Sequence, residues 1–102
     1  MFNANEELIL IVCPQTMAQE VVEHLRGVGV VHYTELREAL GVGETGRHEN
    51  TQIWPGENAL IFCCIRANEV EDVVSDLKDM HDRHLGHTIG LKIFAWPVRE
   101  LL

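Results

Sequence analysis

Hydrophobic and polar residues follow two different periods along the chain. Residues 7–13 and 58–66 form almost unbroken apolar runs, each with the length of a strand that is buried on both faces. Residues 30–36 and 88–96 are rich in β-branched and aromatic side chains, which favour strands. The pattern therefore predicts four strands.

Helical spacing of apolar residues separates these strands in two places. Apolar residues recur every three or four positions over residues 15–26 and again from Asn68 onward. Asn68 followed by Glu71 has the spacing of a capping box, so we expect the second helix to begin there. The expected inner faces are Met17, Val21, Val22 and Leu25 in the first helix, and Val70, Val73, Val74, Leu77 and Met80 in the second. The order βαββαβ predicts an α+β, ferredoxin-like fold, in which two helices cover one face of a four-stranded antiparallel sheet.

The first and third predicted strands are hydrophobic on both faces. In the run 7–13, one face carries Leu8, Leu10 and Val12, and the other carries Ile9, Ile11 and Cys13. The run 58–66 divides in the same way. Two helices cover only one face of the sheet, and a large apolar face is rarely exposed on a monomer. We therefore expect the other face to be buried against further copies of the chain.

Composition narrows the class of protein. The chain has 102 residues, 46% of them hydrophobic, which fits one domain over residues 1–102. Its formal net charge of −8 disfavours nucleic acids and anionic membranes as partners. No apolar run has the length of a membrane span and no signal peptide is found, so we expect a cytoplasmic protein without membrane insertion. Cys13, Cys63 and Cys64 lie in apolar runs and are expected to be buried, reduced thiols.

A long loop is predicted between the second and third strands. Residues from about 38 to 57 are rich in glycine and polar side chains and show almost no periodicity. Loops of this length are uncommon in a compact domain and are usually functional or disordered. Arg47, His48 and Glu49 lie near Trp54, a combination typical of a partner-binding surface, although a loop folded over its own tryptophan is the alternative. No catalytic arrangement is found, so we do not expect an enzyme.

Two short motifs carry a family resemblance. Residues 41–46 read Gly-Val-Gly-Glu-Thr-Gly, and residues 92–100 read Lys-Ile-Phe-Ala-Trp-Pro-Val-Arg-Glu. They are similar to the Gly-Phe-Gly-Arg-Gln and Lys-Ile-Phe-Val-x-Pro-Val-Glu-Glu segments of the PII signalling family, whose members include the nitrogen regulatory protein P-II. The predicted element order also resembles that family, and the long loop falls where the family has its T-loop.

The resemblance implies a homotrimeric regulatory protein with ligand clefts between its subunits. In the family these clefts hold adenine nucleotides, so ATP, ADP and AMP are the effectors implied, and the T-loop docks onto a protein partner. The residues implied to bind the ligand are Gly41, Gly43, Glu44, Thr45, Gly90 and Lys92. Those expected to contact the partner are Arg47, His48, Glu49 and Trp54.

The sequence leaves the effector open. Glu44 stands where the family has an arginine, and a carboxylate there is unfavourable beside a phosphate. The family's basic C-terminal segment has no counterpart up to Leu102. Lys92 either faces an anion or occupies a rim position with its ammonium in water. Gly41 and Gly43 suit a backbone anion site as well as a plain turn.

A divalent metal site is the alternative function. His32, His48 and Glu49 are the candidate ligands, as in a CutA-like trimer, provided that the loop folds back on its strand. The run His81, His84 and His87 also has the residue type of a metal site, but its first two members fall at the end of a predicted helix. We interpret that run as a solvated helix end.

Overall fold

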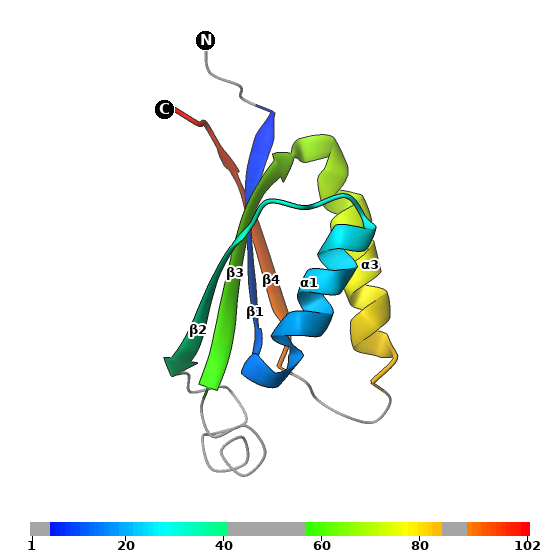
Figure 1. Ribbon diagram of the computed structural model, residues 1–102. Helices are drawn as coiled ribbons and strands as arrows, with labels where there is room; N and C mark the ends of the chain where they lie inside the picture. The colour runs from blue at the N-terminus through cyan, green and yellow to red at the C-terminus, as the bar shows by residue number, and fades with distance from the viewer. Residues whose placement is uncertain (1–4, 41–56, 85–89) are drawn as a thin grey trace.

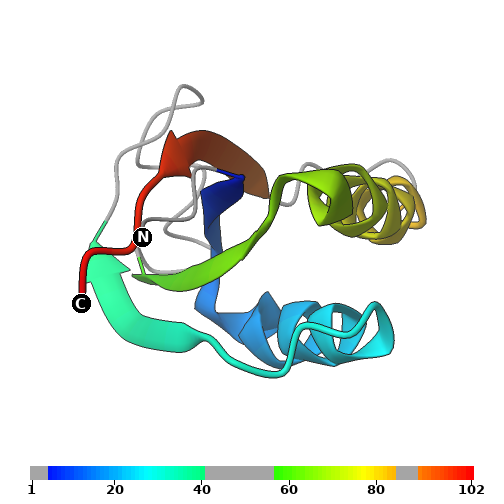
Figure 2. The ribbon, with the colours of Figure 1, turned by 90° about the horizontal axis from the view of Figure 1, so that it is seen from above.

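The computed structural model describes residues 5–40, 57–84 and 90–102. Within these ranges, four strands form one antiparallel sheet in the order β2-β3-β1-β4, and both helices lie on the same side of it (Figures 1 and 2). The strands are β1 (Glu6–Pro14), β2 (Thr34–Leu40), β3 (Glu57–Arg66) and β4 (Lys92–Val98). The helices are α1 (Ala18–Gly27) and α3 (Val70–Asp82), entered through the 3-10 turns η1 (Gln15–Met17) and η2 (Ala67–Glu69). The predicted ferredoxin-like fold is confirmed.

The core lies between the sheet and the two helices. Strand β1 is central and pairs with both β3 and β4, and its residues Ile9, Ile11 and Cys13 are fully buried. The rest of the core is Met17, Ala18, Val21, Val22, Leu25 and Val30, then Ala59, Ile61, Cys63 and Ile65 of β3, and Val73, Leu77 and Met80 of α3. The predicted inner faces of both helices are confirmed, although Val70 and Val74 are only half-buried.

Two side-chain contacts join the helices outside this core. His24 Nδ1 of α1 lies 2.7 Å from Asp76 Oδ2 of α3, and both groups are partly buried. His84, just after α3, places Nε2 at 3.6 Å from Glu20 Oε1. Because α1 and α3 run in opposite directions (Figure 1), the two contacts hold the helix pair at two levels. In the described part of the chain, no helix is long and apolar enough to cross a membrane.

The second strand lies later in the chain than the sequence predicts. It was expected over residues 30–36, but β2 begins at Thr34 and ends at Leu40. Gly29, at φ 93°, turns the chain after α1, and the Val30 N–H donates to the Leu25 carbonyl at 2.9 Å. Val30 then packs into the core, so these apolar residues serve the α1–β2 connection and not the sheet.

The turn before α3 begins earlier than predicted. The expected capping box of Asn68 and Glu71 is wrong, because the pair is Arg66 and Glu69, whose Oε1 accepts the Arg66 N–H at 3.0 Å. The Ala67 N–H donates to the Asn5 carbonyl at 2.8 Å, which ties the end of β3 to the start of β1. The chain therefore enters η2 directly from β3.

Two further expectations, the end of the last strand and the burial of Cys64, are wrong. Strand β4 continues past Trp96 to Val98 and includes Pro97. An edge strand tolerates proline, which has no N–H to donate, because an edge strand has a neighbour on one side only. Cys64 is exposed and not buried, since its side chain points away from the helices. Of the three thiols, Cys13 and Cys63 are buried as predicted.

Candidate ligand-binding site on the open face of the sheet

The sheet face that points away from the helices, here called the open face, is largely apolar. Leu10 of β1 stands between Phe62 of β3 and Phe94 of β4, and Leu8 stands opposite Trp96. Phe94 is 51% exposed and Trp96 is 40% exposed. Figure 2 shows the helices gathered on the other side of the sheet. The predicted two-sided apolar sheet is therefore present in the fold.

A groove of about 700 Å³ lies where β2 begins and reaches from the end of α1 and the α1–β2 connection onto the open face. It is lined from β1, β2, β3, the end of α1 and the α1–β2 connection by Leu8, Arg26, Val31, His32, Tyr33, Thr34, Phe62, Cys63 and Cys64. Small-molecule sites commonly have volumes of roughly 300–1,000 Å³. Arg26 and His32 are exposed, so the groove combines apolar surface with two groups that can meet an anion.

Cys64 brings an exposed thiol to this groove. Partial burial raises its pKa, and the carboxylates of Glu6 and Glu100 raise it further. Burial likewise raises the pKa of Cys13 and Cys63 to about 11. All three thiols are protonated at neutral pH, so the groove offers no thiolate for nucleophilic chemistry.

Gly90 and Lys92 lie at the other end of the sheet. Gly90 has φ 69°, which residues with a Cβ disfavour, and a Cβ there would lie 3.7 Å from Pro14 Cγ. Lys92 is exposed and stands opposite Val12, which places its side chain on the open face. Within the described ranges, no carboxylate forms an ion pair with Lys92. Its ammonium is therefore available to an anion.

The groove and Lys92 belong to one surface but mark opposite ends of it. Leu8 lines the groove and Val12 is the partner of Lys92, and these two β1 residues are four positions apart. At about 3.3 Å per residue, they lie roughly 13 Å apart along the strand. The open face thus offers a mixed polar and apolar groove beside Arg26 and His32 at one end, and the Lys92 ammonium at the other.

Most of the predicted site residues cannot be placed on this surface. Gly41, Gly43, Glu44, Thr45, Arg47, His48, Glu49 and Trp54 lie outside the described residues. Of the others, Gly90 and Lys92 lie together before and in β4, and His32 lines the groove. Sequence reasoning missed the groove. Strand alternation could have placed Phe62 and Cys64 on one face, but the positions of Val31 and His32 depend on a connection that the pattern assigned to a strand.

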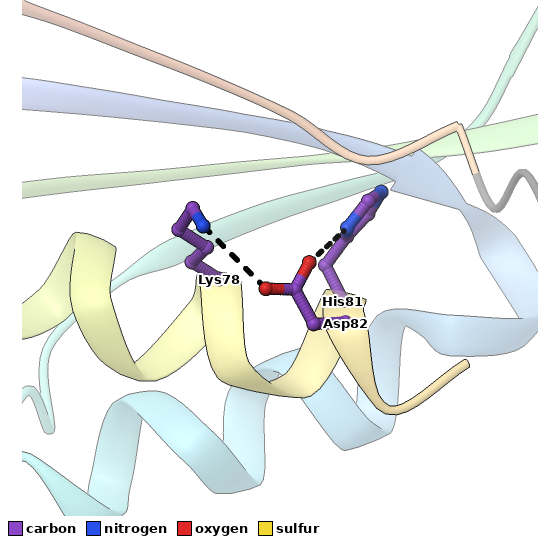
Figure 3. Close-up of polar contacts among 3 residues, drawn as sticks. All are labelled: Lys78, His81 and Asp82. Atoms are coloured by element: carbon purple, nitrogen blue, oxygen red, sulfur yellow. Dashed lines mark hydrogen bonds and ion pairs between the residues drawn. The ribbon is translucent and has the colours of Figure 1, made fainter. Parts of the chain in front are cut away.

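The metal hypothesis gains no ligand set from the described residues. There, no group of three or more His, Cys, Asp and Glu side chains is placed to hold an ion, and His48 and Glu49 fall outside them. His81 lies at the end of α3, where its Nδ1 is 3.2 Å from Asp82 Oδ1, and Lys78 Nζ is 3.5 Å from Asp82 Oδ2 (Figure 3). The hydrogen bond from His81, followed by Lys78, lowers the pKa of Asp82. The predicted helix-end position of His81 is confirmed.

Several solved structures share this fold. CPII, a nitrogen regulatory PII-like protein from Thiomonas intermedia K12 solved with ADP, AMP and bicarbonate, is 13% identical, with a TM-score of 0.73 over 95% of this chain and 93% of that one. A putative PII-like signalling protein from Thermus thermophilus is 18% identical, with a TM-score of 0.69 over 94% and 89%. The PII protein of Arabidopsis thaliana, solved with citrate, is 16% identical, with a TM-score of 0.65 over 94% and 79%.

The sequence comparisons define the family. No curated protein matches the chain at a significant level. The family model described as nitrogen regulatory protein P-II matches residues 6–102, which is nearly the whole chain. The strand order, the two helices on one face and the position of the Lys92 segment agree with that match. The chain belongs to the nitrogen regulatory protein P-II family.

Proposed function

We propose that this protein is a homotrimeric, cytoplasmic regulator that senses a small anionic effector in clefts between its subunits. Adenine nucleotides are the first candidates for that effector. Binding changes the segment between β2 and β3, which then signals to a protein partner. The protein acts by binding and not by catalysis, in keeping with its membership of a regulatory family.

The exposed cation at Lys92 is the observation that carries this proposal. The chain has a formal net charge of −8, so an anion is repelled from most of its surface. Lys92 lies on the open face and forms no ion pair with a described carboxylate, and Arg26 and His32 line the groove that reaches this face beside β2. A nucleotide needs both an apolar surface for its base and cations for its phosphates, and this face supplies both.

Ligands of the structural relatives are consistent with an anion. CPII was solved with ADP, AMP and bicarbonate, and the Arabidopsis PII protein was solved with citrate. All of these ligands are anionic. Their chemistry supports testing adenine nucleotides and carboxylates together, because the identities to this chain are only 13% and 16%.

The exposed apolar residues of the open face support an inter-subunit location of the site. Phe94 and Trp96 leave a large apolar surface exposed on one subunit. A closed trimer would bury these residues and would bring one subunit's groove towards a neighbour's Lys92. Within one subunit, Leu8 and Val12 already separate the groove from Lys92 by roughly 13 Å along β1, so a site built from both features is better completed by a neighbour.

The remaining predicted residues complete the proposal. Gly41, Gly43, Glu44 and Thr45 would adjoin the cleft near Gly90. Arg47, His48, Glu49 and Trp54 would form the surface that the protein partner reads. A deletion of residues 44–57 is expected to abolish partner capture while leaving the trimer intact.

Thermal unfolding in the presence of ligands tests the proposal. ADP, AMP, ATP, bicarbonate and citrate are added separately to the purified protein. A ligand at about 100 times its Kd stabilises the folded state by about 2.7 kcal/mol, which raises the Tm by several degrees. Lys92→Met should reduce the rise strongly. Lys78→Met removes an exposed lysine of α3 that pairs with Asp82, and it should not. If no ligand raises the Tm, the effector proposal is wrong.

A further inference from the structure

Strand β2 has one residue more than the segment of β3 with which it pairs. Leu36 stands opposite Leu60 of β3, but the next aligned pair is Ala39 with Asn58. Arg37 and Glu38 therefore share the position opposite Ala59 alone, which is the arrangement of a β-bulge. The bulge lies near the end of β2, within the described residues.

Glu38 has an unfavourable backbone conformation in this bulge. Its φ is 61°, and it is the only non-glycine residue with a positive φ in the described part of the chain. Residues with a Cβ atom rarely adopt a positive φ, whereas glycine adopts it freely. A contact from outside the strand would offset the cost of this conformation.

Gln15, directly after β1, supplies such a contact. Its side-chain Oε1 accepts the Glu38 N–H, although the two residues are 23 positions apart. Gln15 is half-buried in the turn η1, between β1 and α1. On the other side of the bulge, Asn58 Nδ2 donates to the Ala39 carbonyl at 3.4 Å. Two side-chain amides thus satisfy backbone groups around the extra residue.

The bulge determines which face the end of β2 presents. Side chains alternate along a strand, so one extra residue exchanges the faces of everything after it. With the bulge, Ala39 aligns with Asn58 and shares its face, while Leu40 aligns with Glu57. Without it, Ala39 would stand opposite Glu57, and Leu40, which is 84% exposed, would join the open face.

We propose that Gln15 is a positioning residue that selects the bulged register of β2, and that its loss shifts the end of this strand by one residue. The link to regulation rests on the proposed function, in which the open face is buried between subunits. A shift that turns Leu40 onto that face changes the surface that neighbours share. The register itself is a property of one subunit and is independent of any effector.

Nuclear magnetic resonance of the full chain tests the register directly. In the native protein, cross-strand contacts should connect Ala39 with Asn58, and the Glu38 coupling constant should report a positive φ. In Gln15→Ala, contacts between Ala39 and Glu57 should appear, and the Glu38 amide should exchange about tenfold faster, as expected for the loss of one supporting hydrogen bond. Gln15→Glu retains the acceptor and should keep the native pattern. Gln19→Ala removes an exposed glutamine of α1 that contacts Glu23 and serves as the matched control.

Two changes at Glu38 separate this role from general stability. Deletion of Glu38 removes the extra residue and makes the support unnecessary, so Gln15→Ala should then have no effect on the register. Glu38→Gly removes the backbone strain and should reduce the effect of Gln15→Ala on exchange. The proposal is overturned if Gln15→Ala leaves the Ala39–Asn58 contacts and the Glu38 exchange rate unchanged. Nucleotide binding is measured separately, so its absence would contradict the effector proposal and leave this one intact.

Discussion

Substitution of Phe94 by aspartate should dissociate the proposed trimer. Phe94 is 51% exposed on the subunit. An aromatic side chain presents roughly 200 Å², so about 100 Å² would be buried on assembly, worth about 2.5 kcal/mol per subunit at about 25 cal/mol per Å². That loss alone weakens each subunit contact roughly 70-fold. The buried carboxylate adds a desolvation cost, so the variant should be largely monomeric.

Light scattering after gel filtration over a dilution series measures this effect. The wild type should keep a trimer mass at concentrations where Phe94→Asp elutes as a monomer. Ser75→Asp adds the same charge on the exposed side of α3 and should remain trimeric. Circular dichroism should show that both variants are folded. A trimeric Phe94→Asp, or a wild type that is monomeric throughout, would refute burial of the open face between subunits.

Three further predictions concern the single subunit. Leu77→Ala should lower the free energy of unfolding by about 2–5 kcal/mol in urea, because Leu77 is 1% exposed in the core, whereas Lys78→Ala should change it little. His24→Ala should cost about 1 kcal/mol at neutral pH, and a double-mutant cycle with Asp76→Ala should attribute most of that cost to their contact; additive losses would argue against it. Burial raises the pKa of Cys13 and Cys63 to about 11 from 9.0, so the folded state binds these protons more tightly, and stability should fall as the pH rises from about 9 towards 11. Urea midpoints should show a smaller fall in the Cys13→Ala, Cys63→Ala double variant, and an equal fall would contradict the assignment.

Side-chain periodicity was enough to predict the fold, because most elements bury one face. The spacing of Val21, Leu25, Val73 and Leu77 corresponds directly to the helix surfaces that pack on the sheet. The alternation in β1 likewise identified a buried face and an open one. These patterns arise from burial, which acts on every residue of an element.

Sequence reasoning failed where one turn or one specific contact, and not burial of a whole face, decides the structure. Val30 looks like a strand residue, yet its environment is set by the turn at Gly29. The capping box lies at Arg66 and Glu69, next to the Ala67 N–H, which donates to the carbonyl of Asn5, 62 positions earlier in the chain. The bulge at Glu38 depends on Gln15 and has no local signal, since glutamate does not favour a positive φ. The groove shares this property, because Leu8 and Phe62 meet there only through the sheet.

The central position of β1 has a consequence for biosynthesis. Glu6, near the start of the chain, pairs with Arg66 on one side and with Val98 on the other. Contacts between such distant positions slow folding, because a long loop must be closed before they form. The most apolar strand therefore leaves the ribosome long before either of its neighbours is available. We expect the sheet to close only after β4 has left the ribosome, and β1 to be able to pair with other chains until then.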